Sequence, residues 1–107
     1  MMTWDPATER LCERATEVAN LLRLVANDQR LLILCRLRKG EASVGEMVDL
    51  CGLSQSNVSQ HLGKLRESGL VETRRQGTTI YYTIADTEID ALMTFLCNRF
   101  GKAKVTD

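Results

Sequence analysis

The chain contains little histidine and proline and no long apolar run. Its one histidine, His61, leaves no Cys/His/Asp arrangement for nucleophilic catalysis, and no phosphate-binding loop is apparent. The longest apolar run covers residues 31–35, far short of the roughly 20 residues that a membrane helix needs. The amino-terminal residues lack the basic-then-apolar order of a secretory signal. We therefore expect a cytoplasmic protein that is neither an enzyme nor a membrane protein.

Cysteine is present, but no two cysteines are spaced as a CxxC pair. The four positions are Cys12, Cys35, Cys51 and Cys97. In a reducing compartment such cysteines are expected to be free thiols rather than a disulfide framework.

Neither basic nor acidic residues are in excess, but both are unevenly distributed along the chain. Fourteen basic and 14 acidic residues give a formal net charge of zero. Basic residues gather in segments 30–39 and 64–75, whereas acidic residues gather in segments 5–17 and 86–90. A neutral chain with a basic face suits specific DNA binding with limited non-specific affinity.

Hydrophobic periodicity and capping residues predict a single domain, residues 1–107, that is mainly α-helical with a small β-hairpin. Helices are expected at about 5–26, 28–39, 44–50, 55–68 and 86–100, and hairpin strands at 70–75 and 79–84. Ser43 and Glu46 match a capping box, and Gly52 suits a tight turn between two helices. Two helices joined in this way, followed by a hairpin, predict a winged helix-turn-helix.

The first and last predicted helices carry apolar seams. In the first helix the seam repeats with spacings of 4, 3, 4 and 3, at Leu11, Ala15, Val18, Leu22 and Val25. The stripe on the last helix consists of Ile89, Leu92, Met93, Leu96 and Phe100. We expect a homodimer in which helices at about 5–26 and 86–100 form the interface.

The helix expected at about 55–68 has two chemically different faces. Val58, Leu62 and Leu65 are spaced to point inward. The opposite face carries small or amide side chains, namely Gln55, Ser56, Ser59, Gln60 and Gly63. Glutamine can pair with adenine, serine can bond bases or phosphates, and small residues allow close approach. This pattern predicts a helix that reads the major groove.

Further DNA contacts are expected next to this helix and on the hairpin. Ser54, His61, Lys64 and the helix amino terminus are expected to meet phosphates. The full predicted set is Ser54, Gln55, Ser56, Asn57, Ser59, Gln60, His61, Lys64, Arg74, Arg75 and Thr78. A winged helix used only for protein contacts is the alternative, and the hairpin arginines argue against it.

Three sequence runs resemble the ArsR/SmtB family of repressors. They are ANDQRLLIL at 26–34, GLSQSNVSQHL at 52–62 and LRESGLV at 65–71. The resemblance extends from about Val18 to Phe100. It implies a homodimeric repressor whose first and last helices form the dimer interface. Two symmetric reading helices then predict an inverted-repeat operator in double-stranded DNA.

Many members of this family bind metals, but neither familiar metal site is present. One needs cysteines where this chain has EASVGEM at 41–47, and the other needs histidine on the last helix, which has none. No metal or other cofactor is expected. An unusual arsenite site built from Cys12, Cys35 and Cys97 remains an open alternative.

The run LILCRL at 32–37 resembles a subgroup that senses reactive sulfur or oxidants through a cysteine matching Cys35 and a second on the last helix. In this chain Gly101 occupies the second position, and Cys97 lies one turn earlier, about 5.4 Å along the axis. A disulfide needs Cα atoms about 4.4–6.8 Å apart, so one turn can decide whether the pair forms. Three interpretations stay open: a thiol sensor using Cys35 with Cys97 or Cys12, buried packing residues, or a regulator with no small ligand.

Overall fold

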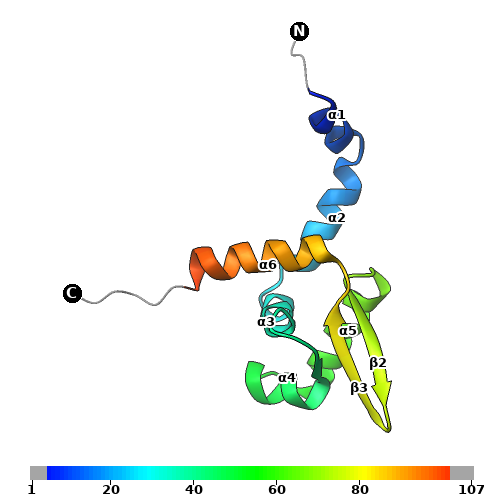
Figure 1. Cartoon of the computed structure of the whole chain (residues 1–107), viewed down its shortest axis with the longest axis vertical. Coiled ribbons are helices and arrows are strands. Elements are labelled where there is room, and N and C mark those ends of the chain that lie inside the picture. The colour runs from blue at the N-terminus through cyan, green and yellow to red at the C-terminus, as the bar shows by residue number, and fades with distance from the viewer. Residues whose placement is uncertain (1–4, 102–107) are drawn as a thin grey trace, which may run out of the picture.

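A computed structural model describes residues 5–101 and forms the winged helix-turn-helix that the sequence predicts (Figure 1). The elements in chain order are α1 Pro6–Glu13, α2 Ala15–Val25, α3 Asp28–Leu37, β1 Ala42–Ser43, α4 Val44–Cys51, α5 Gln55–Glu67, β2 Val71–Gln76, β3 Thr79–Ile84 and α6 Thr87–Phe100. Helices α1 and α2 project from the rest of the domain, and α6 lies over α3 (Figure 1). The hairpin of β2 and β3 extends beside α5 as the wing.

The amino-terminal segment is two helices, and the prediction of one continuous helix over about 5–26 is therefore wrong. Arg14 interrupts it with φ −107° and ψ 17°, and its amide donates to the carbonyls of both Arg10 and Leu11. No described residue of α1 is buried. Packing within the chain therefore does not hold the residues around Arg14 in regular helical geometry. Asp5 caps the start of α1, since its side chain accepts from the Thr8 amide at 2.8 Å and Pro6 occupies the first helical position.

The helix-turn-helix is built from the predicted capping residues. The Ser43 side chain accepts from the Glu46 amide, and the Glu46 carboxylate accepts from the Ser43 amide, which completes the capping box at the start of α4. Gly52 ends α4 with φ 68°, a left-handed conformation that glycine adopts without steric cost. These local signals fix the point at which α5 begins.

The wing belongs to a three-stranded antiparallel sheet of order β1-β3-β2 rather than to an isolated hairpin. In the hairpin Gln76 pairs with Thr79, so the turn is only Gly77 and Thr78. The additional strand β1 pairs Ala42 with Tyr82 and Ser43 with Tyr81. Two residues are too few to show the alternation by which a strand is recognised in sequence, and β1 was therefore not predicted.

A small apolar core lies between α3, α4, α5, α6 and the sheet. Its fully buried large side chains are Ile33, Leu34, Met47, Val58, Leu62 and Leu65. Ile89 and Met93 of α6 and Val25 of α2 also enter this core, so part of each predicted dimer seam is used within the chain. Within residues 5–101 no helix is long and apolar enough to cross a membrane.

Candidate nucleic-acid interface

Helix α5 turns one face to the core and a polar face to solvent. Val58, Leu62 and Leu65 are buried, as their spacing predicts. The predicted base-reading residues are all exposed, namely Gln55, Ser56, Ser59, Gln60 and Gly63. No atom lies within 4 Å of a Cβ built on Gly63, so the surface is open there. A helix of this kind fits a groove about 12 Å wide and offers donors and acceptors to base edges.

The amino-terminal end of α5 is ordered by Ser54. Its Oγ accepts a hydrogen bond from the Asn57 amide at 3.1 Å, and both side chains are exposed. The earlier amides of the first turn have no helical acceptor, so this end can receive a phosphate oxygen. Lys64, in the last turn of the same helix, is also exposed.

The structure turns His61 toward α3, whereas the sequence predicts a phosphate contact for it. Its Nε2 lies 2.8 Å from Gln29 Oε1, and its Nδ1 lies 3.3 Å from a terminal nitrogen of Arg30. Burial, together with the positive charges of Arg30 and Lys64, lowers the pKa of His61 below its ordinary value. His61 is therefore a half-buried link between α5 and α3.

The two wing arginines have different surroundings. Arg74 donates two hydrogen bonds to Glu41, at 2.6 and 3.0 Å, and a third to Gln76 at 2.9 Å. Its guanidinium also lies 4.9 Å from the centre of the Tyr81 ring. The hydrogen bond from Arg74 lowers the pKa of Glu41 below that of an ordinary glutamate. The guanidinium of Arg74 is thus engaged by contacts within the chain.

Arg75 and Thr78 remain available for an external partner. Among residues 5–101 the ion pairs are Arg14–Glu17, Arg36–Glu46 and Arg74–Glu41, so none uses Arg75. Arg75 is exposed on β2, and Thr78 is exposed in the two-residue turn at the tip of the wing. Of the predicted wing contacts, these two keep their polar groups free in the described part of the chain.

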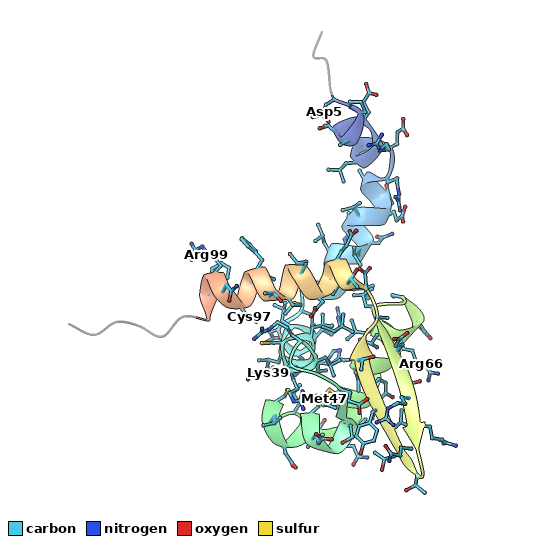
Figure 2. The ribbon with its side chains drawn as sticks, viewed as in Figure 1. Asp5, Lys39, Met47, Arg66, Cys97 and Arg99 are labelled. Atoms are coloured by element: carbon cyan, nitrogen blue, oxygen red, sulfur yellow. The ribbon has the colours of Figure 1, made fainter. Side chains whose placement is uncertain are left out.

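Two of the predicted sensor cysteines are in contact. Cys35 Sγ of α3 lies 3.2 Å from Cys97 Sγ of α6, so the earlier position of Cys97 does not separate the pair. Figure 2 shows Cys97 on the side of α6 that faces α3. The hydrogen bond with Cys97 and burial raise the pKa of the Cys35 thiol, while the charge of Arg38 acts in the opposite direction.

The third predicted sensor cysteine, Cys12, is exposed on α1. No group of three or more Cys, His, Asp or Glu side chains suited to a metal ion occurs within residues 5–101. The arsenite alternative, which needs Cys12, Cys35 and Cys97 together, is therefore not assembled within one described chain.

Comparison with known proteins identifies the family to which this arrangement belongs. Residues 27–73 match the model of the bacterial regulatory protein, arsR family. The biofilm growth-associated repressor of Xylella fastidiosa strain Temecula1 is 43% identical over 99 residues, which cover 89% of this chain and 87% of that protein. This chain belongs to the ArsR family. It is accordingly a winged-helix, DNA-binding transcriptional regulator.

Solved structures of other ArsR-family regulators have the same architecture. Reduced HlyU from Vibrio cholerae superposes with a TM-score of 0.82 at 39% identity, covering 88% of this chain and 99% of that one. The transcriptional repressor BigR from Xylella fastidiosa also gives a TM-score of 0.82, at 42% identity, covering 96% of this chain and all of that one.

Three residues that contact the predicted DNA-binding residues were not themselves predicted from the sequence. Glu41 holds Arg74, while Gln29 and Arg30 hold His61. Each is separated from its partner by more than 30 positions, and no local spacing indicates such a contact. The only sequence signal for Arg30 was its place in the basic segment 30–39.

Proposed function

We propose that the protein is a cytoplasmic, homodimeric repressor that binds an inverted-repeat operator by inserting one α5 helix from each protomer into successive major grooves. The exposed, unobstructed polar face of α5 carries this proposal, because its amide and hydroxyl groups match base edges in kind. Repression is supported by the relatives named as repressors, whereas HlyU of Vibrio cholerae is named an activator.

Homodimerisation is supported by apolar side chains that the protomer leaves in solvent. Leu22 of α2 is 50% exposed, and Phe95 and Phe100 of α6 are 61% and 71% exposed. Phe100 also lines an open apolar groove of about 440 Å³ between α3 and α6, together with Leu31, Leu32, Met93, Leu96 and the thiol pair. A second copy would cover this surface and set the distance between the two α5 helices.

The DNA-reading assignment predicts different effects for a base contact and a phosphate contact. Gln55→Ala is expected to weaken binding to the operator by about 1–3 kcal/mol and to leave binding to random DNA almost unchanged. Arg75→Ala is expected to weaken binding to all sequences and to reduce the salt slope by about 1. Fluorescence anisotropy titrations at several salt concentrations measure both. Equal loss on both DNAs in Gln55→Ala would contradict the assignment of Gln55.

A second proposal is that thiol chemistry controls this binding, and the 3.2 Å contact between the Cys35 and Cys97 sulfurs favours it. A disulfide bond is about 2 Å long, so only a small approach is needed. Oxidation by a peroxide would release two protons and two electrons from the thiols and give one disulfide and two waters. An inorganic polysulfide would accept the same two electrons and two protons and leave as hydrogen sulfide and a polysulfide one sulfur shorter.

Such a bond would join α3 to α6 covalently. Helix α3 packs against both helices of the helix-turn-helix, and α6 contributes to the proposed dimer surface. A link between them would change the distance between the two α5 helices of the dimer. Base contacts would then be lost, while non-specific contacts would remain. We therefore expect oxidation to weaken operator binding.

This second proposal is tested by titrating operator binding with hydrogen peroxide or a polysulfide donor. Wild type is expected to lose affinity and to show a Cys35–Cys97 bridge by mass spectrometry. Cys35→Ser and Cys97→Ser should be insensitive, whereas Cys51→Ser, which removes a half-buried thiol of α4, should respond as wild type does. Unchanged wild-type binding without a bridged species would leave Cys35 and Cys97 as packing residues.

A further inference from the structure

Three helices meet at the side chain of Arg30. Its Nε donates to the Leu24 carbonyl at 2.5 Å, and one terminal nitrogen donates to the Arg23 carbonyl at 3.3 Å. These carbonyls belong to the last turn of α2, where a helix has no amides left to bond them and carries its negative dipole end. The other terminal nitrogen reaches His61 Nδ1 on α5 at 3.3 Å. One guanidinium on α3 therefore joins the end of α2 to the reading helix.

The donor pattern assigns the protonation state of the histidine. Arginine carries only donors, so Nδ1 of His61 must accept the hydrogen bond from Arg30. The other ring nitrogen, Nε2, then carries the proton and donates to Gln29 Oε1 at 2.8 Å. A neutral imidazole satisfies both contacts, whereas a doubly protonated ring would direct an N–H group at the Arg30 guanidinium.

We propose that Arg30 and His61 are positioning residues, which fix helix α5 relative to helix α2 and thereby set the placement of the reading helices on DNA. This inference rests on the proposed homodimer, in which α2 lies at the interface and α5 in the groove. Base contacts tolerate little displacement of α5, whereas phosphate contacts tolerate more. Loss of the link should therefore reduce sequence discrimination more than total affinity.

The charged groups around the ring give the link a predictable pH dependence. Arg30 and Asp28 face His61 from α3, and Lys64 faces it from its own helix. The two positive groups and burial outweigh Asp28, so the pKa of His61 lies below its ordinary value of 6.5. The link needs the neutral ring, so in the folded protein it is complete at pH 6.5 and is lost only as the pH falls to the lowered pKa of His61.

The test uses the full-length protein and two duplexes of equal length, one selected by wild type from a random pool and one of scrambled sequence. Affinity for each is measured between about pH 8 and about pH 5 at constant ionic strength. Wild type should lose discrimination on acidification. His61→Leu should lose about tenfold in discrimination at every pH, the scale expected for one hydrogen bond to a charged group.

His61→Gln is the matched control. Its amide offers one acceptor to Arg30 and one donor to Gln29 but does not titrate, so discrimination should remain near that of wild type and become independent of pH. Because His61 is the chain's one histidine, no other imidazole confuses the titration.

Two results would overturn the proposal. Wild-type affinity that rises on acidification for both duplexes, and no longer does so in His61→Gln, would show a direct phosphate contact by His61. Folded His61→Leu with wild-type discrimination would show that the link positions nothing. Failure of the DNA-reading assignment itself would look different, because wild type would then show no preference between the duplexes even at about pH 8.

Discussion

At the scale of single residues, the partners of a charged side chain decide whether it can bind DNA. Arg74 and Arg75 are neighbours on β2, yet among residues 5–101 only Arg74 is paired, through two hydrogen bonds to Glu41. The side chains of this pair are 49% and 40% exposed, so solvent screens the pair and its contribution to stability is small. We expect its effect on DNA binding to be larger, because it neutralises one of two adjacent cations on the wing.

We predict that Glu41→Gln strengthens binding to DNA of any sequence. Without the carboxylate, Arg74 can turn to a phosphate, and the salt slope should become steeper by about 1. Because Arg74 lowers the pKa of Glu41, protonation should not break the pair until the pH falls below the ordinary glutamate range. Anisotropy titrations against salt measure the change.

Glu72→Gln is the control for this prediction. Glu72 is an exposed carboxylate on the same strand as Arg74, and its replacement removes the same charge without releasing an arginine. An equal change of salt slope in both variants would contradict the idea that Glu41 masks Arg74.

The exposure of the candidate site could be predicted from the sequence to a large extent, but its internal contacts could not. Helical spacing places Ser56 and Gln60 opposite Val58 and Leu62, and the structure agrees because that relation is local. Gln55 is exposed as the first residue of α5. The pairing of Arg74 with Glu41, 33 positions away, depends on β1 lying beside β3. Periodicity shows which face a residue occupies but not which distant element approaches it.

At the scale of elements, caps and turns were predictable because each depends on a few adjacent residues. Ser43, Gly52, Ser54 and Asp86 all act at helix ends as their chemistry indicates. The interruption at Arg14 was missed because the apolar seam continues across it, and nothing in the residue types there disfavours a helix. The wing turn was predicted one residue too long, since Gln76 joins the ladder.

Helix α5 allows a prediction that separates stability from binding. Gly63→Ala places a methyl group in open space on a regular helix, so the free energy of unfolding should rise by about 0.5–1 kcal/mol. If this face lies against bases, the same methyl should obstruct close approach and lower operator affinity by about tenfold. Denaturant unfolding and DNA titration measure the two effects.

Gly45→Ala in α4 is the matched control for Gly63→Ala. An added Cβ there would meet only Ser43 Oγ at 4.0 Å, so a similar gain in stability is expected with operator affinity retained. A Gly63→Ala protein that is more stable and still binds the operator as wild type does would show that this face does not enter the groove.

At the scale of the whole molecule, the protomer leaves an apolar surface on α2 and α6 that its own core does not cover. We predict that Leu22→Glu with Phe100→Glu yields a folded monomer, because both side chains are at least half exposed within the protomer. Sedimentation velocity and circular dichroism measure assembly and folding. Leu50→Glu, at an exposed apolar residue of α4, should remain a dimer. A double variant that still sediments as a dimer would place the interface elsewhere.

The central claim is that two copies of α5 read two symmetric half-sites, and the form of the DNA site tests it most directly. Duplexes selected by wild type from a random pool should be footprinted, and the number of chains on each should be measured. We expect two bound chains and an inverted repeat with half-sites about 34 Å apart, or a multiple of this distance. A single asymmetric half-site occupied by one chain would contradict it.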